Sequence, residues 1–347
     1  MVDESERLSR RAFIGSAGIW LGLAAVGCGT VQSSTIAQQV ASNPLSRGPL
    51  HLRLDDRPGI ASVGVHLADR FGYYLDEGFQ SVTASGPDEG ADLADTLLSG
   101  TSLIGYGELV DLLAPIQAGV PLRVIAALHP MSGLSLVQAD RSQVRTLSDL
   151  DGEEFGLPAS QIDRWSAILA SAGLSDDGLN LRSISDESVV VSLLGGSVAG
   201  VLLDPLRWLA PLELAGAPVD YVPLSRLVDL PPGRVAVTSS AALETHRDDL
   251  VAALRAELAG WQLALSNPRL AVDVVVNHYA ADRNLDEQQV ASEFRALVSI
   301  MTGGSGSPEQ LLAPDPSSID RATSLLARAG FDIPPEVFAV DLLGELG

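Results

Sequence analysis

Residues 50–79 read LHLRLDDRPGIASVGVHLADRFGYYLDEGF, and this stretch predicts the fold. The run from Leu50 to Leu54 is short and apolar, as in a buried strand, and the turn residues Asp55-Asp56-Arg57-Pro58-Gly59 follow it directly. Apolar residues then recur every four positions from Val63 to Leu75, which is the spacing of one buried helix face. The stretch is therefore expected to form a strand, a loop and a helix.

The same unit recurs along the chain, which predicts an α/β fold with largely parallel sheets. In the first half, further strands are expected at 80–84, 102–106 and 122–128, and helices at 88–99 and 109–118. In the second half, strands are expected at 154–157, 179–184, 200–203 and 234–238, and helices at 161–172, 187–194 and 207–214. The next helix is expected to open with the capping-box pattern Thr245-His246-Arg247-Asp248 and to end at Asn267-Pro268.

An export signal precedes the first unit. Arg10 and Arg11 stand before Phe13, where an apolar run begins that ends close to Cys28. This run is too short and too rich in glycine to span a bilayer, and paired arginines are the twin-arginine form of an export signal. Ala25-Val26-Gly27-Cys28 reads as a lipobox, with Ala25 where leucine is more usual. A plain signal peptide that is cut further on is the alternative.

This leader predicts where the protein works. We expect a signal peptide over residues 1–27, a lipid on Cys28 and a flexible, lipid-anchored tether over 28–48. The remainder is then expected to be extracytoplasmic and attached to the cell membrane through its lipid alone.

Composition excludes several classes of function. The chain has 44 acidic and 22 basic residues, a net charge of −22, so no nucleic-acid partner is expected. All basic residues are arginine, and without a lysine the chain forms neither a pyridoxal-phosphate Schiff base nor a P-loop. The single cysteine, Cys28, leaves no intramolecular disulfide and no thiolate metal cluster. We therefore expect no metal and no cofactor.

Four stretches, taken in order, resemble the substrate-binding lipoproteins of ABC importers, in the branch that serves nitrate, sulfonates, taurine and the pyrimidine precursor of thiamine. They are residues 68–79, 97–107, 147–157 and 194–205. The first looks like the family's helix that closes the first strand–helix unit, and the second like its small-residue stretch before the cleft loop. The third is similar to the segment that opens the second lobe, with Asp151 and Glu153 in place of basic residues. The fourth corresponds to a Gly-x-Val-Asp-Ala stretch, with Ala199-Gly200 in place of Asp-Ala.

The resemblance implies a two-lobed fold of the type II periplasmic-binding-protein class, each lobe a mostly parallel sheet flanked by helices. Lobe 1 would comprise residues 49–130 and 239–347, and lobe 2 residues 131–238, with two crossing strands and a ligand cleft between them. The resemblance also implies a small-molecule solute, and an ABC permease with its ATPase as partners, without catalysis. We expect a monomer.

Candidate ligand-binding residues stand where predicted strands end and where the chain crosses between lobes, because open α/β sheets bind ligands beyond the carboxyl ends of their strands. They are Asp56, Arg57, Pro58, Gly59 and Ile60 after the first strand; Tyr106, Gly107 and Glu108 after the third; His129 and Ser132 at the crossing; and Ser160, Gln161, Arg164 beside Trp165, Asp204 and Trp208 in lobe 2.

Several of these residues have a purely structural alternative. Arg57 either pairs with an anionic ligand group or with a neighbouring aspartate. Tyr106 either stacks on the ligand or belongs to the core, and His129 either contacts the ligand or is a structural histidine. Asp204 either accepts hydrogen bonds from an amine or caps a helix, and Trp208 either stacks on a ring or packs inside lobe 2.

The ligand class stays open at the level of sequence. Arg57 and Arg164 favour an anion such as a sulfonate, whereas Glu108 and Asp204, with Tyr106 and Trp208, favour a nitrogen-containing ring such as an aminopyrimidine. A lipoprotein that senses a ligand and signals to a membrane receptor is an alternative function. An exported enzyme is a weaker one, because no Gly-x-Ser-x-Gly or His-Glu-x-x-His pattern occurs.

Overall fold

The computed structural model describes residues 46–87, 92–130, 132–138, 149, 152–174, 180–217, 220–302, 311–312 and 316–346. The expected export signal with Arg10, Arg11 and Phe13, the lipidation site Cys28, and the tether up to residue 45 lie outside the described residues. Within the described part of the chain, no helix combines the length and the apolar character that crossing a membrane requires.

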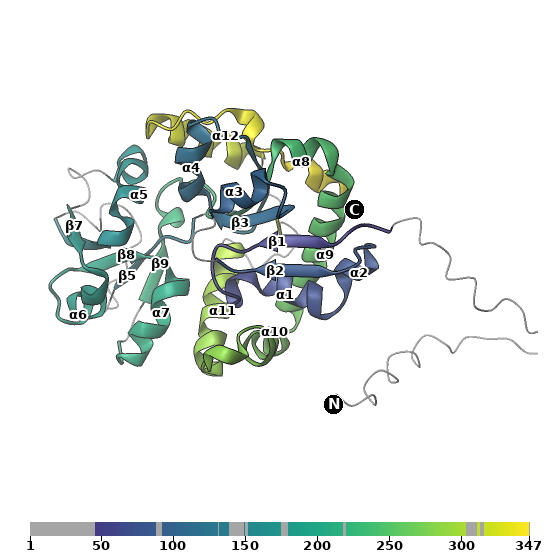
Figure 1. Cartoon of the computed structure of the whole chain (residues 1–347). Coiled ribbons are helices and arrows are strands. Elements are labelled where there is room, and N and C mark those ends of the chain that lie inside the picture. The colour runs from purple at the N-terminus through teal and green to yellow at the C-terminus, as the bar shows by residue number, and fades with distance from the viewer. Residues whose placement is uncertain are drawn as a thin grey trace, which may run out of the picture. The chain divides into compact units, whose positions relative to one another are not determined.

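The first of two five-stranded sheets has the order β2-β1-β3-β10-β4 (Figure 1). Its strands are β1 (Leu50–Arg53), β2 (Val82–Ser85), β3 (Ile104–Glu108), β4 (Leu122–Ala127) and β10 (Arg234–Ser239). β1 runs parallel to both β2 and β3, whereas β10 is antiparallel to its neighbours β3 and β4. The sheet is thus parallel except around one returning strand.

The second sheet repeats this plan with the order β7-β6-β8-β5-β9. Its strands are β5 (Ser135–Gln138), β6 (Glu154–Pro158), β7 (Asn180–Ile184), β8 (Gly200–Leu203) and β9 (Asp220–Pro223). β6 runs parallel to β7 and β8, and β5 is antiparallel to β8 and β9. The chain passes from β4 into β5 and returns from β9 to β10, so it crosses between the sheets twice. The return begins at Arg234, before the expected boundary at residue 238.

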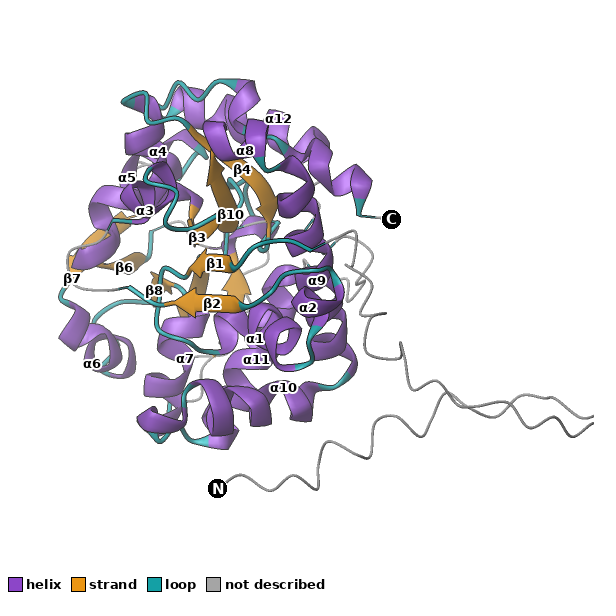
Figure 2. Cartoon of the chain, turned by 45° about the vertical axis from the view of Figure 1, so that its right-hand side comes forward, coloured by secondary structure: helices purple, strands orange, loops and turns teal. Residues whose placement is uncertain are grey.

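Helices flank both sheets (Figure 2). Those in the same stretches of chain as the first sheet are α1 (Val63–Arg70), α2 (Tyr73–Asp76), α3 (Leu93–Leu98), α4 (Leu109–Gln117), α8 (Ser240–Thr245), α9 (Arg247–Ser266), α10 (Pro268–Val274), α11 (Glu287–Met301) and α12 (Pro316–Arg328). Those between strands of the second sheet are α5 (Ala159–Ser171), α6 (Val189–Leu194) and α7 (Pro205–Leu214). Short 3₁₀ turns lie at Ile60–Ser62, Asp186–Ser188, Leu224–Arg226, Ala281–Arg283, Pro335–Val337 and Val340–Glu345, and a π-helical turn at Val275–Tyr279. The predicted alternation of strands and helices is confirmed.

Two local expectations are wrong. The four-residue apolar repeat does not form one helix, because Gly72 adopts a left-handed conformation (φ 79°) that separates α1 from α2 and leaves Leu75 exposed. Thr245 does not cap α9, because it ends α8 instead, where its hydroxyl donates to the Ala241 carbonyl at 2.7 Å. α9 begins at Arg247 without a side-chain cap hydrogen bond.

The core is partly shared between the sheets. One cluster of buried side chains fills the space around α1, α9 and the first sheet, with Trp261 and Tyr74 among its largest members. A second cluster contains Val124 and Val235 of the first sheet together with Leu136 and Phe155 of the second. The two sheets are therefore joined by continuous apolar packing beside the crossings.

Candidate functional site

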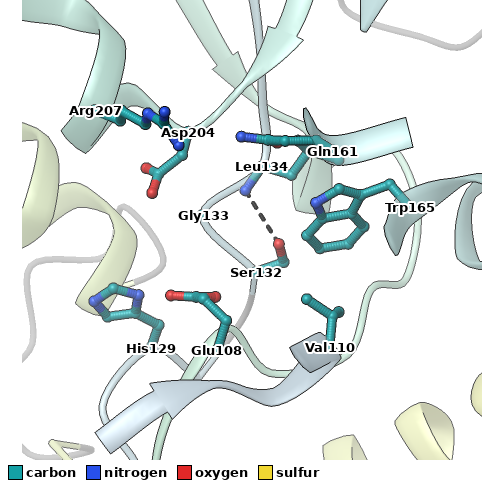
Figure 3. Close-up of a pocket in the computed structure, with 10 residues that line it drawn as sticks. All are labelled: Glu108, Val110, His129, Ser132, Gly133, Leu134, Gln161, Trp165, Asp204 and Arg207. Atoms are coloured by element: carbon teal, nitrogen blue, oxygen red, sulfur yellow. Dashed lines mark hydrogen bonds between the residues drawn. The ribbon is translucent and has the colours of Figure 1, made fainter. Parts of the chain in front are cut away.

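A pocket of about 100 Å³ lies where the first crossing meets the ends of strands from both sheets (Figure 3). Its lining residues are Glu108, Val110, His129, Ser132, Gly133, Leu134, Gln161, Trp165, Asp204 and Arg207. The first two come from the end of β3 and the start of α4, and the next four from the segment between β4 and β5. The last four come from α5 and from the junction of β8 with α7. Both sheets therefore contribute to one pocket.

The topology explains why these residues meet. β3 and β8 each belong to the parallel set of their sheet, and each leads directly into a helix, α4 or α7. β6 leads into α5 in the same way. Parallel strands present their carboxyl ends at one edge of a sheet, so the beginnings of the following helices gather there. The crossing segment closes the space between the two edges.

Glu108 and Asp204 place two carboxyl groups in the pocket, one from each sheet. Burial, together with the charge of Asp204, raises the pKa of Glu108 to about 8, and the charge of Arg234 opposes the rise. Burial also raises the pKa of Asp204 to about 6, against the hydrogen bond from the Leu206 amide and the charge of Arg234. At neutral pH the pair thus holds about one proton.

Asp204 has a second role as the N-cap of α7. Its Oδ1 accepts a hydrogen bond from the Leu206 amide at 2.9 Å, which fixes the carboxyl group at the pocket edge. Asp204 therefore caps a helix, as the structural alternative predicted, and the same side chain also lines the pocket.

Arg234 is the buried cation next to this pocket. Only 4% of the residue is exposed, and its guanidinium forms an ion pair with Asp55 and a hydrogen bond with the Ser62 hydroxyl at 3.3 Å. Its Nε has no hydrogen-bond partner among the described residues. Sequence reasoning missed this residue, although an arginine that opens the apolar strand Arg234-Val235-Ala236-Val237 is a detectable signal.

His129 lines the pocket from the end of β4. Its backbone amide donates to the Arg234 carbonyl at 3.0 Å, and its carbonyl accepts from the Gly233 amide at 3.1 Å, so the two crossings are tied together here. The side chain is buried, and no described residue forms a hydrogen bond with its Nε2. Burial, with the charge of Arg234, lowers the pKa of His129 to about 3, so the imidazole is neutral at physiological pH.

Five candidates from the sequence, Glu108, His129, Ser132, Gln161 and Asp204, line the pocket, and Trp165 lies beside them. Gln161 and Trp165 are almost fully buried on α5, and the Oγ of Ser132 accepts a hydrogen bond from the Leu134 amide at 3.1 Å. Val110, Gly133, Leu134 and Arg207 complete the lining and were not predicted.

The loop after β1 does not line the pocket. Arg57 is exposed, and its backbone amide donates to Asp56 Oδ1 at 2.7 Å. Arg283 donates to the Pro58 carbonyl at 3.0 Å and lies next to Gly59. Ile60 is part of the core around the first sheet.

Of the remaining candidates, Tyr106, Gly107, Ser160 and Trp208 are not among the residues that line the pocket. Tyr106 is buried and donates to Glu257 at 2.7 Å, which is the core alternative, and Gly107 follows it within β3. Ser160 donates to Asp186 at 2.8 Å, and Arg164 lies on the second turn of α5. Trp208 packs in the core of the second sheet, with the Arg207 guanidinium 5.7 Å from its ring centre.

The described residues include no group of three or more His, Cys, Asp or Glu side chains that is arranged to hold a metal ion. The pocket offers hydrogen-bonding and stacking groups instead, which is the chemistry of reversible binding to a small organic molecule.

The family model described as NMT1/THI5 like matches residues 60–271, more than half of the chain. The chain belongs to the NMT1/THI5-like family. The expected resemblance is thereby confirmed at the level of the family. The matched segment begins at the turn before α1 and ends in α10, so it includes both crossings and every residue that lines the pocket. No curated protein matches the chain in sequence.

Solved structures share the fold of this NMT1/THI5-like protein. The periplasmic aliphatic sulphonate binding protein SsuA from Escherichia coli is 13% identical with a TM-score of 0.60, over 86% of this chain and 92% of that one. The alkanesulfonate-binding protein SsuA from Xanthomonas axonopodis pv. citri, bound to MOPS, is 15% identical with a TM-score of 0.53, over 86% and 98%. The desulfurization enzyme DSZB is 16% identical with a TM-score of 0.53, over 86% and 98%.

At these identities the likeness shows the fold alone. The expected α/β fold of the periplasmic binding proteins is confirmed for this member of the NMT1/THI5-like family. Because binding proteins and an enzyme share that fold, the chemistry has to be argued from the pocket.

Proposed function

We propose that this protein is the solute-binding component of an ABC importer, which captures a small organic solute between two lobes and delivers it to a membrane permease. The observation that carries the proposal is the pocket formed jointly by residues of both sheets at the crossing. Export by the twin-arginine route, a lipid on Cys28 and an extracytoplasmic location are part of the same proposal, and they rest on the leader sequence.

A pocket shared by two sheets couples ligand binding to the arrangement of the lobes. A ligand that contacts Glu108 or His129 on one side and Gln161 or Asp204 on the other stabilises the closed arrangement, because only that arrangement makes all contacts. Helices from the two halves also contact each other outside the pocket, where the Ser292 hydroxyl on α11 donates a hydrogen bond to the Glu213 carboxylate on α7 at 2.9 Å. A permease that recognises the closed arrangement would thereby distinguish loaded from empty protein.

We propose binding without catalysis. Among the described residues that line the pocket, Ser132 is the one with a hydroxyl group, and that oxygen already accepts a hydrogen bond from the Leu134 amide. The neutral His129 and the two carboxyl groups are suited to hydrogen bonding. The alternative is an exported enzyme, and the experiment below distinguishes the two by whether the bound solute is chemically converted.

The proposal is tested by thermal unfolding of the purified full chain against taurine, alkanesulfonates, nitrate, aminopyrimidines and small amines. A specific solute at 100 times its dissociation constant is expected to raise the midpoint by roughly 2–4 °C. Replacing Gln161 with Ala should abolish the shift, because Gln161 is buried in the pocket wall. The same change at the exposed Gln262 of α9 should preserve it.

A shift followed by unchanged recovery of the solute supports binding alone, whereas chemical conversion of the solute would favour the enzyme. Uptake of the identified solute by cells with and without this gene then separates the importer from a sensor. The proposal is contradicted if no solute gives a shift that depends on Gln161.

A further inference from the structure

The acidic side chains that line the pocket disfavour binding of an anionic ligand. Glu108 and Asp204 face the same space from opposite sheets, and Figure 3 shows their carboxyl groups on either side of the crossing segment at Gly133. Each lies at the N-cap position of a helix, α4 or α7. At neutral pH the pair carries about one negative charge, which repels an anion placed between the two carboxyl groups.

At two of the three helices that begin beside the pocket, α7 and α5, protein carboxylates accept hydrogen bonds from first-turn amides. Asp204 accepts the Leu206 amide of α7. Asp186 accepts both the amide and the hydroxyl of Ser160 in the first turn of α5, at 3.3 and 2.8 Å. Free amides at such positions would favour an anion, so their use by aspartates lowers the capacity of this pocket for a sulfonate or a carboxylate.

Among the described side chains near the pocket, the guanidinium groups of Arg234 and Arg207 are engaged elsewhere. Arg234 is paired with Asp55 and does not line the pocket. Arg207 lines it from the rim, but its side chain is 62% exposed, lies 3.7 Å from Asp186 and covers the ring of Trp208. Surface guanidinium groups in such pairs add little to the binding of a buried anion.

His129 is the second, independent sign of a ligand. The residue is buried and lines the pocket, and among the described residues its Nε2 has no hydrogen-bond partner, a state that costs free energy unless a ligand supplies the missing partner. A neutral imidazole can accept a hydrogen bond through that nitrogen. Together with two carboxyl groups, it forms an acceptor-rich lining.

We propose that the ligand carries a cationic nitrogen group, of the ammonium or amidinium kind, that is held between the carboxyl groups of Glu108 and Asp204 and donates hydrogen bonds to the pocket wall. This inference rests on the proposed function and names the chemical class of its solute. Trp165 supplies an apolar surface for the rest of a small ligand.

Binding of such a cation is linked to the release of a proton. Glu108 is faced by Asp204, Asp55, Asp111 and Arg234, and Asp204 by Arg234, Arg207 and Asp55, while His129 stays neutral. Without ligand, Glu108 keeps its proton up to about pH 8. A bound cation favours the ionised carboxylate, so its affinity is expected to rise from pH 6 to pH 8 and then level off. An anion would show the opposite trend.

Three probes of similar size and different charge test the inference: acetamidinium, acetamide and methanesulfonate. Each is titrated against the purified full chain at pH 6, 7 and 8, with tryptophan fluorescence as the readout because Trp165 borders the pocket. At pH 8, acetamidinium is expected to bind about tenfold or more tightly than either other probe. At pH 6, acetamidinium is expected to bind more weakly than it does at pH 8.

Two substitutions that remove a charge and keep the shape complete the test. Glu108→Gln and Asp204→Asn should each weaken acetamidinium binding about tenfold or more, and Glu108→Gln should also remove the pH dependence between pH 7 and 8, where Asp204 is already ionised. Asparagine retains the helix cap of α7, so Asp204→Asn is expected to fold. Glu187→Gln, an exposed change near α6, is the matched control and should bind like the unaltered protein.

The inference is overturned if methanesulfonate binds as tightly as acetamidinium, if acetamidinium does not bind at pH 8, or if neither substitution weakens it. A Gln161-dependent response to an anionic or neutral solute in the thermal experiment would overturn this inference and leave the proposed function standing. Absence of any such response would instead remove the proposed function.

Discussion

At the residue scale, Arg234 connects the fold with the charge of the pocket. It begins the strand that returns to the first sheet, and its guanidinium joins Asp55 and Ser62, which lie in the loop and turn after β1. Its charge opposes the rise in pKa of Glu108 and Asp204 and helps to lower the pKa of His129. One buried cation therefore shifts the pKa of three groups that line the pocket, while burial remains the larger cause.

Loss of this cation is expected to destabilise the fold. Arg234→Met leaves the half-buried Asp55 without its partner, so the free energy of unfolding in urea should fall by about 3 kcal/mol. Arg321→Met is the matched control, because Arg321 lies 3.8 Å from Asp229 in a pair that is mostly exposed. That change should cost less than about 1 kcal/mol. Equal effects of the two substitutions would contradict the role assigned to Arg234.

At the element scale, α1 and α9 pack so closely that glycine is required on both helices. A Cβ atom at Gly260 would overlap the Gly64 carbonyl oxygen and lie 2.9 Å from the Ala68 amide nitrogen. A Cβ atom at Gly64 would overlap the indole ring of Trp261. This contact holds the Trp261 indole where it donates to Glu257 at 3.1 Å, and Glu257 in turn holds Tyr106 of β3.

Gly260→Ala is therefore expected to force α1 and α9 apart, although alanine is normally the better helix former. The free energy of unfolding should fall by about 3 kcal/mol, as in overpacked cores. Gly344→Ala, in the last 3₁₀ turn, meets open space and should leave stability unchanged within about 0.5 kcal/mol. Chemical denaturation of both variants checks this, and a neutral Gly260→Ala would show that the helices separate without cost.

At the scale of the whole molecule, buried titratable groups set the dependence of stability on pH. Burial raises the pKa of Glu108 to about 8 and that of Glu257 to about 6, whereas it lowers the pKa of His66 and of His129 to about 3. Because the two histidines are neutral in the folded protein, their contribution to the free energy of unfolding increases as pH rises from about 3 to their unfolded pKa near 6.5. Above pH 6.5 this contribution no longer changes with pH. Between pH 6.5 and 8, Glu108 dominates.

Unfolding releases a proton from Glu108 in this range, because the carboxyl group is protonated in the folded, ligand-free protein and ionised in the unfolded chain. The stabilisation from its raised pKa is complete below the unfolded pKa and is lost as pH rises through about 8. The free energy of unfolding should thus fall by up to about 1.4 kcal/mol per pH unit. Urea titrations at pH 6.5, 7.25 and 8 measure this slope. Glu108→Gln should flatten it, and an unchanged slope would assign the titration to another group.

Local sequence patterns were sufficient to predict the class of fold and the positions of most elements. The strand expected at 200–203 coincides with β8, and the helix expected at 207–214 lies within α7, because apolar periodicity, proline and glycine act locally. Glu108, His129, Ser132, Gln161 and Asp204 were found by the same reasoning, since each follows a strand or lies in the crossing. Their use in ligand binding stays a prediction.

Which strand ends share a pocket, and what charge the pocket carries, follows from the packing of the two sheets and could not be predicted from local patterns. The loop after β1 has the sequence features of a binding loop, yet it contacts Arg283 from the far end of the chain. Arg234 and Asp55 are distant in sequence, and so are Glu108 and Asp204. Burial and the distance between such residues exist only in the assembled chain. Local patterns therefore predict elements, and the packing of the two sheets sets the pKa values and the candidate chemistry of the site.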